Sequence, residues 1–314
     1  MKILFFSDIH FHHSHTFSRL TQEGFSIREL EHISCADTII KICKKEKIDK
    51  VVFGGDMFGP VGDNMSSQSL SAICIFFEKL QSLNLPIDIL VGNHDLSFST
   101  NSTHIHKLVA FKNWQNLKIY DEPCEINNLV YMPYCTNNQY AQQFLENIVE
   151  KDKKVIFSHL EIKGINLGNG IFTEKGIELD LLKQFRMVLQ GHYHLGGSLA
   201  KNVQIVGSTQ RLSFKDKGIA RNNIILYDTD SNKIERRSFE CPDWLTFADD
   251  NINDLLKLDP NNYVKIEVSM DILLTEEIKN KLETFKGKDV HIDLTRLVVN
   301  RNIENEIISE NEID

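Results

Sequence analysis

Apolar runs and helical patterns alternate along the first part of the chain. Residues 2–6, 50–53 and 87–91 are mostly apolar, which is typical of strands buried on both faces. Residues 27–47 and 66–82 repeat apolar positions near the helical period, and they predict two helices. Strands that alternate with helices predict a sheet whose faces the helices cover.

Later apolar runs predict further strands with fewer helices between them. These runs lie at 129–132, 154–157, 187–189, 203–206 and 223–227. Because helices no longer separate every pair, we expect the sheet to become mixed or to pair with a second sheet. We assign residues 1–240 to this first domain.

The pattern restarts after the Cys-Pro-Asp-Trp stretch at 241–244. Residues 263–269 alternate as a strand, residues 275–285 form a helical pattern behind a threonine cap, and residues 288–298 are extended again. We therefore predict a small β-α-β module within 241–299. The polar and acidic residues 300–314 predict a tail that is disordered or folds only against a partner.

The composition fits a folded enzyme outside the membrane. The 314 residues are 41% hydrophobic, and the six cysteines form no C-x-x-C pair, so we expect reduced thiols. No apolar run reaches the about 18 residues of a membrane helix, and the N-terminal MKILFFSDIH turns polar too early for a secretory signal. We expect a cytoplasmic protein without a membrane partner. The formal charge of −9 does not favour nucleic-acid binding.

Polar side chains with metal-binding atoms follow five of the predicted strands. The stretches are Ser7-Asp8-Ile9-His10, Gly54-Gly55-Asp56, Gly92-Asn93-His94-Asp95, Ser158-His159 and Gln190-Gly191-His192-Tyr193-His194. Open α/β sheets expose the carboxyl ends of their strands to a shared crevice, so we expect these side chains to meet. Their donors suit manganese, iron or zinc, and their number exceeds what one ion needs. The sequence predicts two divalent ions bridged by a carboxylate.

The ordered series D-x-H, G-D, G-N-H-D, H and G-H-x-H resembles the calcineurin-like metallophosphoesterases over most of residues 1–230. The resemblance implies a four-layer α-β-β-α sandwich and a hydrolase with two divalent metal ions, for which we expect Mn²⁺. It implies one ion held by Asp8, His10, Asp56 and His194, and another held by Asp56, Asn93, His159 and His192. His94 would be the general acid at the leaving oxygen, and Asp95 would orient it.

Two shorter motifs narrow the resemblance to the SbcD-like nuclease subunits, which process DNA double-strand breaks and include bacteriophage forms. They are the GDMF stretch at 55–58 and the GSTQRLSF stretch at 207–214. The predicted β-α-β module occupies the position of that branch's DNA-facing cap. This branch implies a metal-dependent DNA exonuclease and endonuclease that works as a homodimer with an ABC-type coiled-coil ATPase. The arginine-containing G-D-x-x-D-R-G block of the phosphoprotein phosphatases is missing.

A basic cluster follows the last predicted ligands and could contact DNA phosphates. It consists of Arg211, Lys215, Lys217 and Arg221, and a solvated surface explains it equally well.

Two rival functions stay open. The protein could be a phosphodiesterase or phosphatase for a small nucleotide, which suits its acidity, or a scaffold subunit of a repair complex without chemistry, which the complete ligand set opposes.

Overall fold

The computed structural model describes residues 1–11, 20–59, 66–97, 105–166, 172–212, 214, 223–248, 251–259, 261–267, 276–284 and 291–292. The predicted tail at 300–314 therefore lies outside the described residues. Contacts between Cα atoms divide the chain into two compact units. The first comprises residues 1–13, 29–210 and 218–240, and the second comprises residues 14–28, 211–217 and 241–314. Among the described helices, none is long and apolar enough to cross a membrane.

The first unit contains two six-stranded sheets. The first sheet has the order β12-β11-β1-β2-β3-β4, with β1 (Lys2–Phe6), β2 (Lys50–Phe53), β3 (Ile87–Leu90), β4 (Leu117–Tyr120), β11 (Ile224–Asp228) and β12 (Lys233–Arg237). Strands β1 to β4 are parallel, whereas β11 and β12 pair antiparallel at the edge. The parallel strands end together, which gathers the loops that follow them.

The second sheet has the order β5-β6-β7-β8-β10-β9. Its strands are β5 (Cys124–Ile126), β6 (Leu129–Met132), β7 (Val155–Ser158), β8 (Met187–Gln190), β9 (Gly197–Ala200) and β10 (Val203–Ile205). Its central strands β6, β7, β8 and β10 are parallel, and β5 and β9 pair antiparallel at the two edges. Four of the later predicted strands, at 129–132, 154–157, 187–189 and 203–206, therefore lie in a second sheet. The fifth, at 223–227, joins the first sheet as the antiparallel β11 and makes it mixed, so both predicted outcomes occur.

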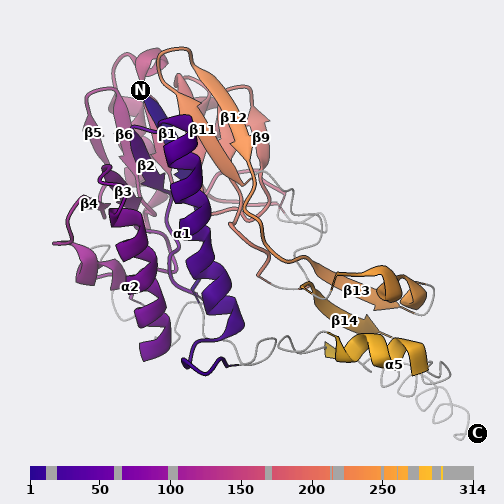
Figure 1. The fold of residues 1–314 in the computed structure, drawn as a ribbon. Coiled ribbons are helices and arrows are strands. Elements are labelled where there is room, and N and C mark those ends of the chain that lie inside the picture. The colour runs from indigo at the N-terminus through magenta and orange to yellow at the C-terminus, as the bar shows by residue number, and fades with distance from the viewer. Residues whose placement is uncertain are drawn as a thin grey trace, which may run out of the picture. The chain divides into compact units, whose positions relative to one another are not determined.

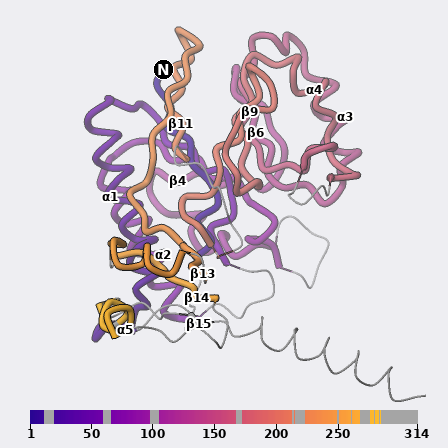
Figure 2. The backbone as a smooth tube through the Cα atoms, turned by 90° about the vertical axis from the view of Figure 1, so that its right-hand side faces the viewer, coloured from indigo at the N-terminus to yellow at the C-terminus, as the bar shows by residue number. Residues whose placement is uncertain are grey.

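Helices cover the outer face of each sheet and complete four layers (Figure 2). The long helices α1 (Ile27–Glu46) and α2 (Ser67–Gln81) lie along the first sheet (Figure 1). Phe76 of α2 packs against Phe6 of β1, with the ring centroids 6.4 Å apart. On the second sheet, α3 (Asn138–Asn147) and α4 (Leu179–Leu182) bury Ala141 and Leu182 against strand residues such as Val188. The expected α/β class with two sheets is confirmed.

The inner faces of the two sheets form one apolar core. Phe5 of β1 contacts Phe157 of β7, with ring centroids 5.8 Å apart, and Val52 and Leu189 belong to the same buried cluster. These side chains leave water entirely, because strands covered on both faces have no exposed side. Rigid packing between the sheets fixes the positions of the strand ends.

The short 3₁₀ helices of the first unit are η1 (Lys107–Phe111) and η2 (Lys151–Lys153). The second unit has a three-stranded sheet in the order β13-β14-β15, formed by β13 (Trp244–Ala248), β14 (Tyr263–Glu267) and β15 (His291–Ile292). All three strands run parallel, and η3 (Ile252–Lys257) and α5 (Glu276–Glu283) complete the unit. The predicted strand and helix of the module are present, and β13 adds a strand where we placed only a boundary.

Candidate metal centre

The site lies in the loops at the carboxyl ends of β1, β2, β3, β7 and β8. Backbone hydrogen bonds tie the first two loops together, since Asp8 N donates to Gly55 O at 3.0 Å and His10 N donates to Asp56 O at 3.1 Å. Asp8, His10, Asp56 and His192 all have positive φ angles between 55° and 69°. Non-glycine residues rarely adopt this region, and such strain concentrates at functional sites.

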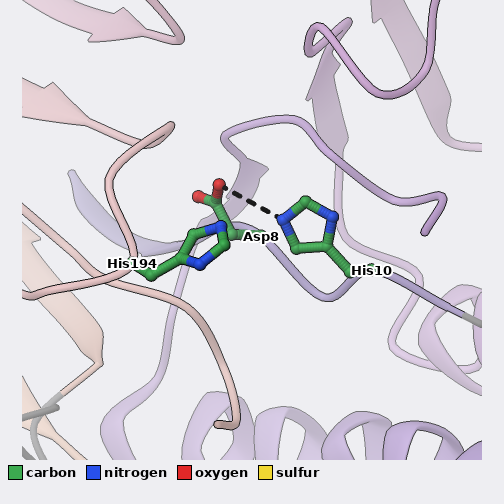
Figure 3. A group of neighbouring side chains, drawn as sticks. All are labelled: Asp8, His10 and His194. Atoms are coloured by element: carbon green, nitrogen blue, oxygen red, sulfur yellow. Dashed lines mark ion pairs between the residues drawn. The ribbon is translucent and has the colours of Figure 1, made fainter. Parts of the chain in front are cut away.

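Asp8, His10 and His194 form the first group of donors (Figure 3). One donor atom from each lies within 4.8 Å of the others, and His10 Nε2 is 3.8 Å from Asp8 Oδ1. The Nδ1 atom of His10 is 3.1 Å from the carbonyl of Phe58, which fixes the ring with its other nitrogen toward Asp8. This arrangement of imidazole and carboxylate atoms suits a borderline divalent ion.

Asp56, His159 and His192 form the second group. His159 Nε2 is 3.3 Å from Asp56 Oδ2, and its Nδ1 is 2.6 Å from Gly54 O, so the backbone orients the ring. Asn93 Oδ1 lies 3.1 Å from His159 Nε2 and 2.9 Å from His192 Nδ1. The amide oxygen of Asn93 therefore belongs to this second group of donors.

The carboxylate of Asp56 lies between the two groups. Its Oδ2 is 3.7 Å from His10 Nε2 in the first group and 3.3 Å from His159 Nε2 in the second. Burial alone would raise the pKa of Asp56, but the imidazoles of His159 and His10 outweigh it and lower the pKa. Asp56 is thus a carboxylate that faces both groups, which is the geometry a bridging ligand needs.

Two buried donor atoms of the first group have no hydrogen-bond partner among the described residues. They are Asp8 Oδ1 and His10 Nε2. Buried polar atoms nearly always find a partner, and an orphaned carboxylate oxygen beside an orphaned imidazole nitrogen fits a metal ion. The donor set is carboxylate, imidazole and amide oxygen, so the residues present fit the divalent metals that the family resemblance implies.

His94 forms a third group of donors with His10 and Asp56, and one donor atom from each lies within 4.8 Å of the others. Its ring is 4.8 Å from that of His10, and its backbone N donates to Asp56 Oδ1 at 2.8 Å. The side-chain Nδ1 is buried without a hydrogen bond to the described residues. Burial lowers the pKa of His94, which is half-buried.

The hydrogen-bond partners of the Asp95 carboxylate differ from our expectation, which was that Asp95 orients the His94 ring. It accepts hydrogen bonds from the backbone N–H groups of Asp56, Met57, Phe58 and Gly92, at 2.8 to 3.2 Å. Burial and the charge of Asp56 raise the pKa of Asp95 to about 7, against the pull of these N–H donors. Asp95 joins the loop after β3 to the loop after β2, and so it positions Asp56.

Residues of the GSTQRLSF stretch pack beside the site. Thr209 N donates to the carbonyl of Asp8 at 3.4 Å, and Asn223 holds this stretch through hydrogen bonds to the carbonyls of Ser208 and Thr209. We did not predict the role of Asn223, although a polar residue at the start of an apolar strand was a visible signal. The stretch supports the backbone that carries Asp8.

Of the four residues predicted to contact DNA, the structure describes one, Arg211. Arg211 donates to the carbonyl of Trp244 at 3.1 Å and lies 3.6 Å from Asp243, with 20% of its side chain exposed. Within the second unit, Arg211 therefore has a structural partner already. Lys215, Lys217 and Arg221 lie outside the described residues.

Comparisons with known proteins place the chain among its relatives. The sequence model of the calcineurin-like phosphoesterase family matches residues 1–196. The chain is 24% identical over 278 residues to exonuclease subunit 1 of Enterobacteria phage T4, across 81% of this chain and 80% of that protein.

Similar solved structures include a dimetal phosphatase from Danio rerio and the nuclease MPE of Pseudomonas putida. The first is 12% identical, with a TM-score of 0.41, and the match covers 65% of this chain and 86% of that one. The second is 11% identical, with a TM-score of 0.33, covering 74% and 86%. The family match covers well over half of the chain and contains every predicted ligand from Asp8 to His194. The chain belongs to the calcineurin-like phosphoesterase family.

Proposed function

We propose that this protein is a two-metal phosphodiesterase that hydrolyses DNA. The position of Asp56 between two groups of donors carries this proposal, because a shared carboxylate is what separates a two-ion centre from two unrelated sites. One ion would be held by Asp8, His10, Asp56 and His194. The other would be held by Asp56, Asn93, His159 and His192.

The side chains of the centre have separate tasks. When bound, two divalent ions supply a nucleophile from water at neutral pH and offset the charge that develops on the phosphate. His94 donates a proton to the leaving oxygen, a step for which general acids give roughly 10²–10⁴-fold. Asp95 positions Asp56 through the loop backbone.

DNA is the proposed substrate because of the sequence relative. The phage protein is called an exonuclease subunit, and its similarity extends over 81% of this chain, beyond the residues that hold the metals. We further propose that residues 241–299 act as a small DNA-facing module and that Arg211, Lys215, Lys217 and Arg221 take part in phosphate contacts. Manganese is the proposed metal.

The word subunit in the name of that relative supports a multi-subunit assembly. We propose a homodimer that works with an ABC-type coiled-coil ATPase in recombination or double-strand-break processing. A diesterase for small nucleotides would use the same centre, and a scaffold would need none of it. The experiment below separates these three functions.

The test is manganese-dependent release of nucleotides from linear duplex and hairpin DNA. Wild type, Asp56→Asn, His94→Ala and the remote control Asp180→Asn would be compared, since the side chain of Asp180 is 89% exposed on α4. We expect cleavage by wild type and the control, and at least roughly a hundredfold loss in His94→Ala. If the protein does not cleave DNA but rapidly hydrolyses a small nucleotide diester, the substrate is a small nucleotide and not DNA. Absence of both activities would favour a scaffold.

A further inference from the structure

A cavity lies at the amino ends of the strands, opposite the metal centre. It has a volume of about 740 Å³, within the roughly 300–1,000 Å³ of small-molecule sites. Its lining includes residues at the start of β2, β3 and β4 in the first sheet and of β6, β7 and β8 in the second. This is the end of the first unit marked N in Figure 1. The metal ligands follow the opposite ends of these strands, so the cavity is a separate site.

The wall of the cavity includes a satisfied polar cluster around the buried Asp88. Lys50 Nζ and Tyr131 OH each donate to Asp88 Oδ2 at 2.5 Å, and Tyr120 OH lies 3.5 Å from Asp88 Oδ1. The rings of Tyr120 and Tyr131 stack at 3.9 Å between the two sheets. Because Lys50 neutralises Asp88, this carboxylate does not repel an anion. Lys50 uses two of its three donors here, the second on Tyr131 OH at 3.3 Å.

The rest of the lining carries positive charge. Among the described residues, one other carboxylate lines the cavity, that of Asp230, and it pairs with the N-terminal ammonium of Met1 at 2.9 Å. Three further cations line the cavity, which are Lys118, Lys153 and Arg186, and Lys153 pairs with Glu150. With these ion pairs cancelled, Lys118 and Arg186 leave the lining positive by two charges on a chain whose formal charge is −9. Such a local reversal of sign favours an anionic ligand.

Two of these cations have no ion pair with any other described residue. Lys118 of β4 has its Nζ 5.0 Å above the ring of Tyr120, and Arg186, just before β8, donates to the carbonyl of Thr229 at 2.6 Å. The two residues come from different sheets. Guanidinium and ammonium groups with free donors are the usual partners of phosphate oxygens.

We propose that this cavity binds a small phosphate-bearing anion, which Lys118 and Arg186 hold from the two sheets, with the spare donor of Lys50 beside them. Such a ligand links the first sheet to the second and stabilises the folded state by mass action. The site does not depend on the metals or on the proposed nuclease activity. Inorganic phosphates and organic phosphates such as mononucleotides share this chemistry.

The test uses the full chain, freed of metal by a chelator, so that bound metals cannot capture the phosphate. Inorganic pyrophosphate would be titrated calorimetrically and in thermal unfolding into wild type, Lys118→Glu, Arg186→Glu and the control Lys201→Glu. Lys201 is an exposed lysine in the turn between β9 and β10, outside the cavity. We expect saturable binding with a raised unfolding temperature, and affinity at least roughly tenfold weaker in both cavity variants but unchanged in the control.

A second titration with adenosine monophosphate distinguishes the two sources of phosphate. Binding of adenosine monophosphate tighter than that of pyrophosphate supports an organic phosphate as the occupant, and equal or weaker binding supports the inorganic ion. Lys118 is exposed, so its variant remains informative if Arg186→Glu does not fold. No saturable binding of millimolar pyrophosphate, or equal binding by wild type and Lys118→Glu, would overturn the proposal whatever the nuclease assay shows.

Discussion

The carboxylate of Asp95 accepts a hydrogen bond from the backbone N–H of Asp56, with 3.0 Å between nitrogen and oxygen. Asp95 Oδ2 also accepts from Gly92, while its Oδ1 accepts from Met57 and Phe58. One fully buried side chain therefore fixes the backbone of the residue that faces both groups of donors. The geometry of the centre depends on this contact, because Asp56 is held at a strained φ of 59°.

Replacing Asp95 by asparagine tests this positioning role. The side-chain NH2 group of Asn cannot accept a hydrogen bond. Two of the four backbone N–H groups therefore lose their acceptor and face the N–H bonds of this amide. We expect the free energy of unfolding to fall by about 2–6 kcal/mol, since each of the two buried donors left unpaired costs about 1–3 kcal/mol. Denaturant unfolding of the metal-free protein measures the change, with the exposed Asp180→Asn as the matched control. A loss no larger than that of the control would show that the loop holds without Asp95.

Gly92 has room for no side chain. A Cβ atom at this position would collide with the Asp56 carboxylate and with its backbone N. We therefore expect Gly92→Ala to displace Asp56 and to reduce the bound metal from two ions to one or none, as measured by elemental analysis. Gly197→Ala is the control, because a Cβ at Gly197 meets no atom within 4 Å. Full metal content in Gly92→Ala would mean that Asp56 does not bridge.

Burial makes two of the cysteines poor nucleophiles. Removal from water raises the pKa of Cys43 and of Cys135 to about 12. Alkylation requires the thiolate, whose fraction at a given pH falls roughly tenfold for each unit of pKa. Peptide mass spectrometry after iodoacetamide treatment should therefore show both residues labelled roughly a thousandfold more slowly in the native protein than in the unfolded one. Labelling at equal rates in the two states would contradict the burial of these thiols.

The sequence identified the central strands because burial on both faces leaves a clear apolar signal. β1, β2 and β6 have the predicted bounds. The edge strand β12 has the sequence KIERR and pairs only with β11. Its polar, partly exposed side chains leave no apolar run, so the strand was not predicted. Helix α3 was also missed, because only Ala141 and Leu145 of its ten residues are buried.

The predicted donors converge because each follows a parallel strand, and strand ends can be recognised in a sequence. The role of Asp95 could not be predicted in the same way. Three of its four partners are backbone N–H groups 37 to 39 residues earlier in the chain, and backbone groups leave no signal in side-chain identity. The contact between Arg28 and Trp244 could not be predicted either, because the two residues are far apart in the sequence. In the structure, Arg28 Cζ lies 4.6 Å from the centroid of the Trp244 ring. Contacts within the second unit that join distant segments can be recognised only once the fold is known.

His159 and His192 have opposite protonation behaviour although both belong to the second group of donors. Burial alone would lower the pKa of His159, but the carboxylates of Asp56 and Asp8 raise it from 6.5 to about 9. Burial and the charge of His159 lower the pKa of His192 to about 4. In the metal-free protein at pH 8, His159 is therefore protonated and His192 is neutral. Only a neutral imidazole binds a metal, so under the proposed ligand set His159 releases its proton when the ion enters.

Calorimetric titration of Mn²⁺ in two buffers of different ionisation enthalpy measures this release. At pH 8 we expect His159→Asn to release about one proton fewer than wild type, and His192→Asn to release as many as wild type. The sign for stability follows from the raised pKa of His159. Its contribution to the stability of the metal-free protein is complete below pH 6.5 and is lost as the pH rises through about 9. Metal affinity should rise over the same interval, and an affinity independent of pH between 6.5 and 9 would show that His159 enters the centre already neutral.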